Sequence, residues 1–444
     1  MKNRTRAPAV SEVPPVPAER TSLRQAPVVE LICAGTELLD GKTDAHRAEL
    51  ALRLRASGLR LSRQTVLPDD LGALAGAARA ALLRCDALIV CGGLGPTFDD
   101  LTREAVARAL GRELVFSPRL YAGIRRKFAR LAARLPRENR RQAFLISGAR
   151  ALPNRTGSAP GQWLVLKRPG RRPQSVALLP GPPREMAPML EHEVLPRLRR
   201  AYGDGMHAAA WVLHLCGLPE SAADQRLKPL IRQAGPELDF TILSGHSQVD
   251  FHIFARCASS RRAGRLVARC RRLAWRLVGA HVFGEGPATL ESAVGGLLRR
   301  RRLSLAVAES CTAGLLAGRL TSTPGSSSYF RGGVLAYHDA VKKDLLGVRP
   351  ATLSRHGAVS AACSREMAQG ARRAAGADVG VAITGIAGPS GGTPRKPVGL
   401  VFVAIAGPGP AALAHQLRLP GERDAVRQRA AAAALRLLWA HLRP

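Results

Sequence analysis

Short apolar runs alternate with longer stretches in which apolar residues recur at helical spacing, beginning at Val28. The short runs predict buried strands, and the longer stretches predict amphipathic helices. The predicted order is strand 28–33, helix 45–57, strand 59–67, helix 71–84 and strand 87–91. Because strands that alternate with helices favour a parallel sheet with helices on both faces, the pattern predicts an α/β fold class.

The same alternation continues beyond this first group. A helix is predicted over 118–134, where Ser117 can cap its first turn and proline takes the tolerated first position. A strand at 175–179 and a helix at 184–200 follow. The segment after them predicts a small α+β unit, with strands 208–215 and 248–255 and helices 221–233 and 261–278.

The last part of the chain again has an α/β pattern. Its helices are predicted at 290–301 and 423–442, and its strands at 303–308, 333–336, 379–384 and 399–406. Residues 1–27 are rich in proline, alanine and arginine without periodicity, which predicts a flexible extension. We therefore divide the chain into this extension and three domains, at 28–203, 204–286 and 287–444.

Composition narrows the class of protein. Hydrophobic residues make up 46% of the 444 positions and charged residues 23%, which excludes a disordered polycation. The eight cysteines are widely spaced without a C-x-x-C pair, so neither a disulfide framework nor a zinc ribbon is indicated. No apolar stretch approaches the ~18 residues that a membrane-spanning helix needs. We expect a cytoplasmic protein without a membrane partner.

The charge balance is strongly positive, with 67 Lys and Arg against 33 Asp and Glu and a net charge of +34. The arginines form short clusters throughout the chain, and aromatic residues make up only 4% without interleaving among them. Basicity alone does not predict specific nucleic-acid binding. Solvated arginine-rich faces, or a field that attracts anionic small molecules, explain the charge equally well. A non-catalytic protein that binds nucleic acid or another partner remains the alternative to an enzyme.

A glycine-rich loop supplies the first candidate site. Gly92, Gly93 and Gly95 follow the predicted strand 87–91 and precede a helix, a geometry that lets backbone N–H groups approach a phosphate. Two adjacent carboxylates, Asp99 and Asp100, would repel a bare phosphate, but they could hold a divalent cation that bridges to it. Helix capping is the alternative role, although it accounts for only one of the two.

The second candidate site follows the strand that ends before Glu309. Ser310 lies in a turn rich in small residues before a helix, where its hydroxyl could be exposed and helix N–H groups could stabilise an oxyanion. Lys342 or Lys343 could accept the serine proton if it were shielded from water. Consecutive helical residues point ~100° apart, so only one of them can face the serine. Two solvated surface lysines are the alternative.

Four motifs in order resemble the amino-terminal domain of the CinA (competence/damage-inducible protein) family, which is itself similar to the molybdopterin-binding MoaB/MogA fold. They are Gly35-Thr36-Glu37, Gly92-Gly93-Leu94-Gly95-Pro96-Thr97 with Asp99-Asp100, Asn154 with Gly157, and Pro180-Gly181-Pro182-Pro183. The resemblance implies metal-dependent hydrolysis of ADP-ribose. Asp99 and Asp100 would then serve the metal, and the nucleotide site would be lined by Gly35, Thr36, Glu37, Gly92, Gly93 and Gly95. At Asp44-Ala45-His46 the chain departs from the Thr-Asn pair that is usual in the family.

The carboxy-terminal part resembles the CinA nicotinamide-nucleotide amidase domain. The motifs are Glu309-Ser310-Cys311-Thr312, Pro324-Gly325-Ser326-Ser327 and Thr384-Gly385-Ile386-Ala387-Gly388. The resemblance implies a Ser/Lys amidohydrolase of nicotinamide mononucleotide that needs no cofactor. We also expect the protein to form a homo-oligomer. The family's spacing selects Lys342 as the base for Ser310, with Tyr337 and Thr384 completing the hydrogen bonds and Cys311 as a packing residue. The implied substrate contacts are Glu309, Thr312, Ser326, Ser327, Gly385, Gly388, Arg423 and Arg427.

Overall fold

The structure is a computed structural model that describes residues 27–41, 46–130, 132, 134–170, 172–203, 206–245, 248–407 and 411–443. The predicted extension lies outside these residues except for its last position, as do Asp44 and Ala45. The described chain forms two compact units. The first contains the residues up to Ala209 together with Arg256–Ser260, and the second contains Ala210–Ala255 together with the residues from Arg261 onward. Each is described by itself.

A six-stranded sheet forms the centre of the first unit, with the order β2-β1-β3-β8-β7-β6. Its members are β1 (Val28–Ala34), β2 (Arg60–Leu67), β3 (Ala87–Cys91), β6 (Arg150–Leu152), β7 (Gly161–Leu166) and β8 (Gln174–Leu179). The strands β2, β1, β3 and β8 are parallel, as the alternation of strands and helices predicts. The edge formed by β7 and β6 is antiparallel, which was not predicted.

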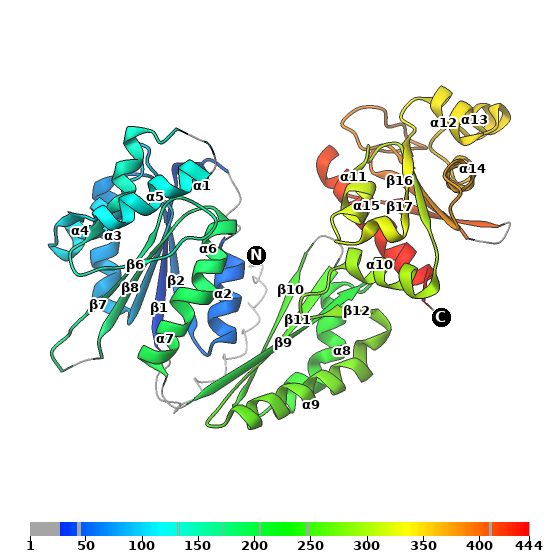
Figure 1. Cartoon of the computed structure of the whole chain (residues 1–444). Helices are drawn as coiled ribbons and strands as arrows, with labels where there is room; N and C mark the ends of the chain where they lie inside the picture. Colours follow the sequence, from blue (N-terminus) through cyan, green and yellow to red (C-terminus); the bar gives the residue numbers. More distant parts are fainter. Residues whose placement is uncertain are drawn as a thin grey trace, which may run out of the picture. The chain divides into compact units, whose positions relative to one another are not determined.

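Helices cover both faces of this sheet (Figure 1). The first face carries α2 (His46–Ala56), α6 (Pro183–Met189), a π-helical segment (Leu190–Val194) and α7 (Leu195–Tyr202), and the second carries α3 (Leu71–Arg84) and α4 (Thr102–Leu110). Successive residues of β1 serve the two cores, because Leu31 packs on the first face and Ile32 on the second. Because successive side chains enter the two cores in turn, a parallel strand that is covered on both faces has a continuous run of apolar residues in the sequence.

Other elements complete the unit. They are α1 (Thr36–Leu39) near the start and then β4 (Leu114–Phe116), α5 (Pro118–Arg130), a 3-10 segment (Arg137–Ala143) and β5 (Phe144–Ile146). The predicted cap of α5 is confirmed, since the Ser117 hydroxyl accepts a hydrogen bond from the Leu120 N–H at 3.3 Å.

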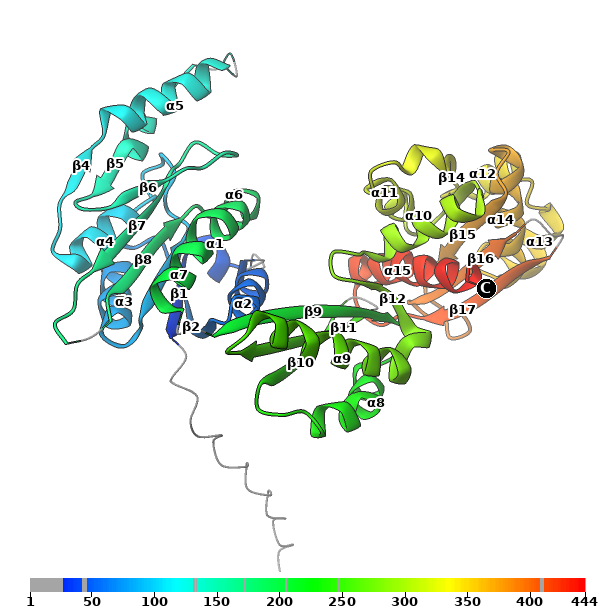
Figure 2. The same cartoon turned by 60° about the horizontal axis from the view of Figure 1, so that its bottom comes forward.

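A separate four-stranded sheet follows in the chain, with the order β10-β11-β9-β12. Its strands are β9 (His207–Cys216), β10 (Leu238–Ser244), β11 (Gln248–Cys257) and β12 (Val282–Glu285). Figure 2 shows α8 (Glu220–Arg232) and α9 (Ser260–Val278) on one face of it. The strands β10 and β12 were not predicted.

The carboxy-terminal sheet has the order β14-β13-β15-β16-β17. Its strands are β13 (Leu305–Glu309), β14 (Phe330–Leu335), β15 (Val379–Gly385), β16 (Leu400–Ala406) and β17 (Ala412–Arg418). The first three are parallel, and β16 and β17 continue the sheet in antiparallel fashion.

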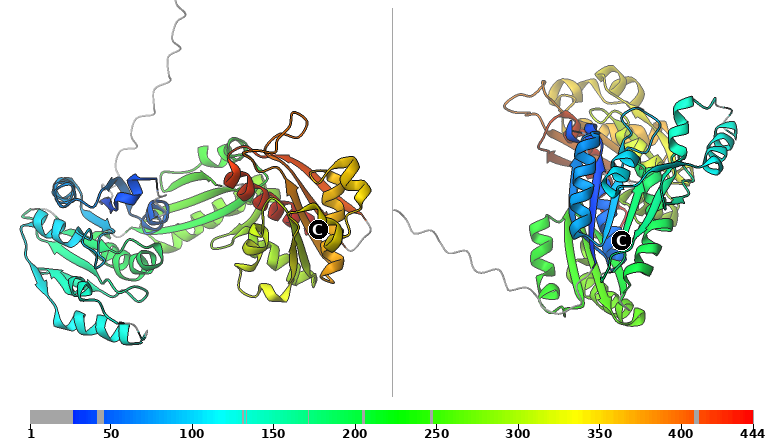
Figure 3. Two further views of the ribbon diagram at one scale, coloured as in Figure 1. Left: turned by 90° about the horizontal axis from the view of Figure 1, so that it is seen from above. Right: turned by 90° about the vertical axis from the view of Figure 1, so that its left-hand side faces the viewer.

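Helices again lie on both faces of this sheet. One core contains α10 (Leu290–Arg301), α11 (Leu315–Thr321) and α15 (Arg423–His441), and the opposite core contains α12 (Asp339–Leu346) and α14 (Ala361–Ala374), with α13 (Pro350–His356) packed on α14. The left view of Figure 3 shows α15, in red, running along the sheet.

All eight cysteines are buried, and none of them forms a disulfide in the structure. Burial raises the pKa of Cys85, Cys216, Cys311 and Cys363 to about 11. Within the described residues, no helix combines the length and the apolar character that crossing a membrane would need.

Candidate active sites

A pocket of about 350 Å³ lies at the carboxyl edge of the parallel strands in the second unit. Ser310 follows β13, Tyr337 follows β14 and Thr384 lies near the end of β15. Glu309 pairs with Leu335 on one side and with Ile383 on the other, so the three strands end at the same level. Ligands of open α/β sheets commonly bind at this edge. The lining residues are Ser310, Cys311, Tyr337, Asp339, Lys342, Ala358, Val359, Thr384, Gly385, Ile386, Ala387, Gly388, Ser390, Gly391 and Arg423.

A tight turn holds Ser310 in the lining of the pocket. The Ser310 N–H donates to the Ile383 carbonyl oxygen at 2.9 Å, and the Ser310 carbonyl oxygen accepts from the Ala313 N–H at 3.2 Å. Ala313 and Gly314 then take φ values of 49° and 94° before α11 begins. The sequence predicts an exposed serine hydroxyl, but in the structure Ser310 is only 8% exposed.

The structure distinguishes the two candidate lysines by burial. Lys342 is 1% exposed and lines the pocket, where its Nζ donates to the Tyr337 carbonyl oxygen and to Asp339 Oδ1, both at 3.1 Å. The Lys343 side chain is 52% exposed and forms an ion pair with Asp344. Only Lys342 therefore shares the pocket with Ser310.

Glu309 has a different role from the substrate contact expected of it. Its side chain is buried, and its carboxylate accepts hydrogen bonds from the N–H groups of Gly314 at 3.0 Å, Leu316 at 3.1 Å and Ala317 at 2.8 Å. These are the donors at the amino-terminal end of α11. The prediction that helix N–H groups stabilise an oxyanion is therefore wrong for these three donors, since the carboxylate already occupies them.

Hydrogen bonds fix the other polar groups around the pocket. The buried Thr384 hydroxyl donates to the Ala358 carbonyl oxygen at 2.9 Å. Arg423 reaches from the start of α15 and donates to the Gly388 carbonyl oxygen at 2.6 Å and to the Tyr337 hydroxyl at 2.9 Å. Arg423 thus links two segments of the pocket wall, while the Tyr337 side chain remains exposed.

Four other expected contacts lie outside the lining residues. Ser326 and Ser327 lie in a short 3-10 segment after α11, where the Ser326 hydroxyl donates to the Thr321 carbonyl oxygen. Arg427 donates to the Thr312 carbonyl oxygen at 3.3 Å, which braces the turn after Ser310. The Thr312 hydroxyl is buried in that turn and has no hydrogen-bond partner among the described residues.

Sequence reasoning missed Asp339 as a part of the site. Its carboxylate bonds Lys342 from three positions earlier on α12, a spacing at which opposite charges meet on a helix. That spacing is visible in the sequence and could have identified it. The loop residues Ala358 and Val359 also line the pocket, but apolar residues in a connecting loop give no comparable signal.

A second cleft, of about 390 Å³, lies at the carboxyl edge of β1, β3 and β8 in the first unit. Its lining includes Gly35, Glu37, Gly92, Gly93, Gly95, Asp99 and Asp100 from the predicted nucleotide site. Thr36 is not among them, but its N–H and its hydroxyl both donate to Asp69, which does line the cleft. A side chain at Gly92 would bring a Cβ within 2.1 Å of the Ala34 carbonyl oxygen, so the loop requires glycine there.

Asp100 holds the glycine loop in shape. One carboxylate oxygen accepts from the Gly95 N–H at 2.7 Å, and the other accepts from the Thr97 N–H at 2.8 Å and from the Thr97 hydroxyl. The buried Arg103 donates to the carbonyl oxygens of Leu94 and Gly95 from the inner side. Asp99 is exposed at the cleft.

Acidic groups dominate the described lining of this cleft, which contains no lysine or arginine. The carboxylates are Glu37, Asp69, Asp99, Asp100 and Glu185. Within the described residues, no three His, Cys, Asp or Glu side chains are grouped as a metal site made of protein ligands alone. Mg²⁺ is usually held by one or two carboxylates together with substrate phosphates, and Asp99 and Asp100 are compatible with that mode.

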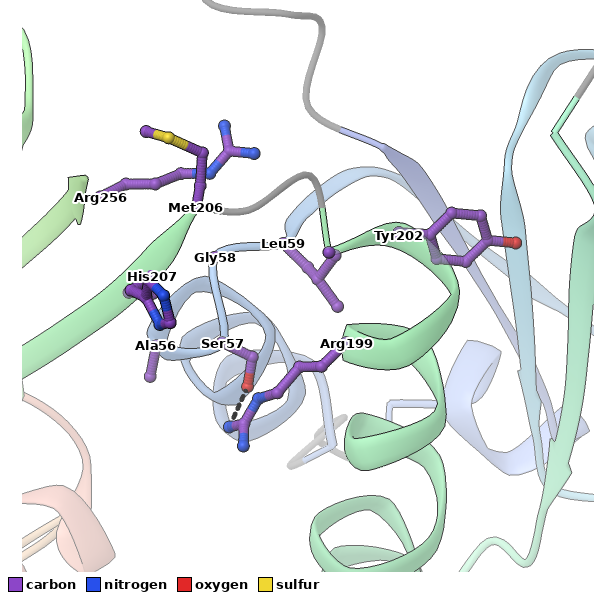
Figure 4. A pocket seen from close by; sticks show the side chains of 11 residues that line it. Ala56, Ser57, Gly58, Leu59, Arg199, Tyr202, Met206, His207 and Arg256 are labelled. Carbon is purple, nitrogen blue, oxygen red and sulfur yellow. Dashed lines mark hydrogen bonds between the residues drawn. The ribbon is translucent and has the colours of Figure 1, made fainter. Parts of the chain in front are cut away.

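A third pocket in the first unit carries no comparable chemistry (Figure 4). It lies beside the end of α2, where the Ser57 hydroxyl donates to the Arg53 carbonyl oxygen and accepts from Arg199 at 2.8 Å. No carboxylate stands among its described lining residues, which include His207 and Arg256. Ser57 therefore acts as a structural link between two helices.

Comparisons with known proteins agree with this architecture. Residues 287–442 match the family model described as the CinA C-terminal domain, and residues 30–200 match the model described as a probable molybdopterin binding domain. The chain thus joins a MoaB/MogA-like α/β domain to a CinA-type α/β domain. The chain belongs to the CinA family, because close relatives match it over nearly its whole length.

One such relative, from Moorella thermoacetica, is named a competence-damage inducible protein and is 42% identical over 93% of this chain and 98% of its own. A CinA-like protein of Gemmatimonas aurantiaca is 42% identical over 92% of this chain and 94% of its own. Among solved structures, the competence/damage inducible protein of Agrobacterium tumefaciens is 39% identical and covers 34% of this chain and 91% of its own, with a TM-score of 0.33.

Proposed function

We propose that the protein is a nicotinamide-nucleotide amidase, which hydrolyses nicotinamide mononucleotide to nicotinate mononucleotide and ammonia. The observation that carries the proposal is the shared pocket of Ser310 and the buried Lys342 at the carboxyl edge of a parallel sheet. A serine with an adjacent base is the usual arrangement for nucleophilic attack on an amide. The CinA family relationship supports the same chemistry.

In the proposed reaction, Ser310 Oγ attacks the carboxamide carbon while Lys342 Nζ accepts the hydroxyl proton. The carbon–nitrogen bond then breaks, and ammonia leaves with the proton that Lys342 returns. Water hydrolyses the resulting acyl ester and restores the serine hydroxyl. The pyridinium ring already withdraws electrons from the carbonyl group, so the protein supplies mainly position, a base and hydrogen bonds.

Fixed groups would position the substrate. Thr384 is held by its hydrogen bond to Ala358, so its hydroxyl has one defined orientation at the pocket. Arg423 already bonds Gly388 and Tyr337, and a guanidinium with five donors retains capacity for a substrate phosphate. These two residues lie on different elements, which makes the pocket depend on the packing of α15 against the sheet.

The test is ammonia release from nicotinamide mononucleotide by the full chain and its variants. Ser310→Ala and Lys342→Met should each lower turnover by ~10³-fold or more with unchanged thermal unfolding. Lys343→Met is the matched control, because it removes the same charge one residue away at an exposed position. Cys311→Ala is a second control and should keep most of the activity. An inactive Lys343→Met, or a fully active Ser310→Ala, would contradict the Ser/Lys assignment.

The cleft of the first unit supports a second proposal, the metal-dependent hydrolysis of ADP-ribose. The observation that favours it is a glycine loop lined by carboxylates without a cationic side chain, where a pyrophosphate could bind only together with cations. Asp99→Asn should lower this activity without loosening the loop, whereas Asp100→Asn should also lower the melting temperature. Hydrolysis of ADP-ribose that persists in chelator at the full rate would exclude the metal requirement.

A further inference from the structure

The helix α9 presents an unusual concentration of positive charge. Its 19 residues include seven arginines and no acidic residue. Five of the arginines form what we call the arginine stripe: Arg261, Arg265, Arg269, Arg272 and Arg276. All five are exposed.

The stripe occupies one side of the helix. At 100° per residue, its members fall within about 80° of one another, and at 1.5 Å per residue they extend along about 22 Å. The buried residues of α9 lie on the opposite side of the helix, about 180° away. They are Ala263, Val267, Cys270, Ala274 and Val278. Figure 2 shows that α9 covers one face of the four-stranded sheet. The stripe is therefore the outermost line of the helix.

The two arginines beside the stripe differ from it in their contacts. Arg262 forms an ion pair with Glu237, and Arg271 forms one with Glu285. Among the described residues, no ion pair includes a member of the stripe. Like charges three or four positions apart on a helix repel one another, so the stripe costs stability that a neutral face would not. A partner that carries closely spaced negative charges would remove this repulsion.

We propose that the arginine stripe binds double-stranded DNA through its phosphate backbone, without sequence preference. A duplex carries one negative charge for every ~1.7 Å of its axis, so a straight line of guanidinium groups can meet several phosphates at once. Guanidinium groups also donate paired hydrogen bonds to phosphate oxygens. The function is independent of the proposed amidase site, which lies on the carboxy-terminal sheet.

Two other occupants fit the stripe less well. A membrane-binding helix inserts its apolar side into the lipid, but the apolar side of α9 is buried against its own sheet. A single strand is held largely by bases that stack on aromatic rings. The exposed Trp275 lies near one end of α9, and its indole N–H already donates to Glu285. Of these three partners, only the DNA duplex can be bound by a line of positive charges alone, because its phosphates lie on its outside.

The test compares two variants of the full chain with the same change in net charge. The stripe variant carries Arg261→Gln, Arg265→Gln, Arg269→Gln, Arg272→Gln and Arg276→Gln. The control carries glutamine at five exposed arginines scattered over other elements, namely Arg79→Gln, Arg108→Gln, Arg200→Gln, Arg232→Gln and Arg365→Gln. Glutamine is a good helix former, and thermal unfolding checks that both variants remain folded.

Binding is measured by the fluorescence anisotropy of a labelled duplex of mixed sequence between ~50 and ~200 mM salt. The stripe variant should bind ~100-fold more weakly, and its slope of log affinity against log salt should fall by ~4.5, about 0.9 for each of the five lost contacts. The control should bind within about threefold of the unmodified protein. Equal losses in both variants would overturn the proposal, since bulk charge would then explain the binding.

Two further arms identify the partner. The single strand of the same sequence should bind more weakly than the duplex. If it bound more tightly and depended on the stripe, the duplex assignment would be wrong. Vesicles containing phosphatidylserine are the third probe, and stripe-dependent binding to vesicles without binding to the duplex would make α9 a membrane-contacting face instead.

Discussion

Glu309 offers the sharpest test of how the turn after Ser310 is held. The change Glu309→Ala removes the acceptor of three N–H groups at the start of α11. Each unmet buried donor costs ~1–3 kcal/mol, and the loss of an anion at a helix amino terminus adds ~0.3–1 kcal/mol. Because Gly314 and Ala317 are only half-buried, we expect a total loss near the lower end of this range, about 3 kcal/mol. A unit of this size should then melt ~6–12 °C lower.

The assay is calorimetric unfolding of the full chain, followed through the transition that the variant shifts. Glu422→Ala is the matched control, because Glu422 also precedes a helix but is exposed and makes no side-chain cap. Its effect should stay within about 0.5 kcal/mol. If Glu309→Ala were as mild as this control, the carboxylate would not be what holds the amino-terminal end of α11.

Three further outcomes follow from the structure. Ala313→Gly should raise the stability by ~0.5–1 kcal/mol, because a left-handed backbone costs alanine ~1–2 kcal/mol. The matched change Ala317→Gly lies within α11 and should lower the stability by ~1 kcal/mol. Calorimetry that gave both changes the same sign would refute this prediction. Burial lowers the pKa of His214, but its hydrogen bond to Asp250 contributes to a net rise above the usual 6.5. The positive charge on His214 therefore stabilises the fold in acid, and this stabilisation is lost as the pH rises through the pKa of the folded state. His214→Gln should therefore cost more melting temperature near pH 6 than near pH 9, and an equal cost at both would count against it. Because the pKa of Cys311 is about 11, alkylating reagents near pH 8 should leave ammonia release unchanged, and rapid inactivation through Cys311 would show that its thiol is accessible.

Much of the fold follows from local pattern. The helix 71–84 and the strand 87–91 have the predicted bounds, since a capping aspartate and an uninterrupted apolar run mark them clearly. The antiparallel edges of the two sheets cannot be predicted in this way, because the residues of β7 and β17 do not indicate whether the neighbouring strand runs parallel or antiparallel. The alternating polar residues of β17 conceal it further, since one of its faces is exposed.

The candidate site divides in the same way. The sequence places Ser310 and a lysine after neighbouring strands, and helical geometry allows only one lysine to face the pocket. The role of Glu309 could not be predicted, because its carboxylate bonds N–H groups five to eight positions later, beyond the range of the usual capping motifs. Ser326 and Ser327 were expected near the substrate from motif resemblance alone, and a shared motif does not show how far its residues lie from the pocket.

The burial of every thiol makes this protein convenient for site-directed labelling. Maleimides and oxidants react with exposed thiolates, and none of the eight native cysteines offers one. A single cysteine introduced on the surface should therefore be the first group to react, with no prior removal of native residues. Arg272→Cys would place a fluorophore on the outer side of α9, where a change in emission would report contact with a polyanion directly.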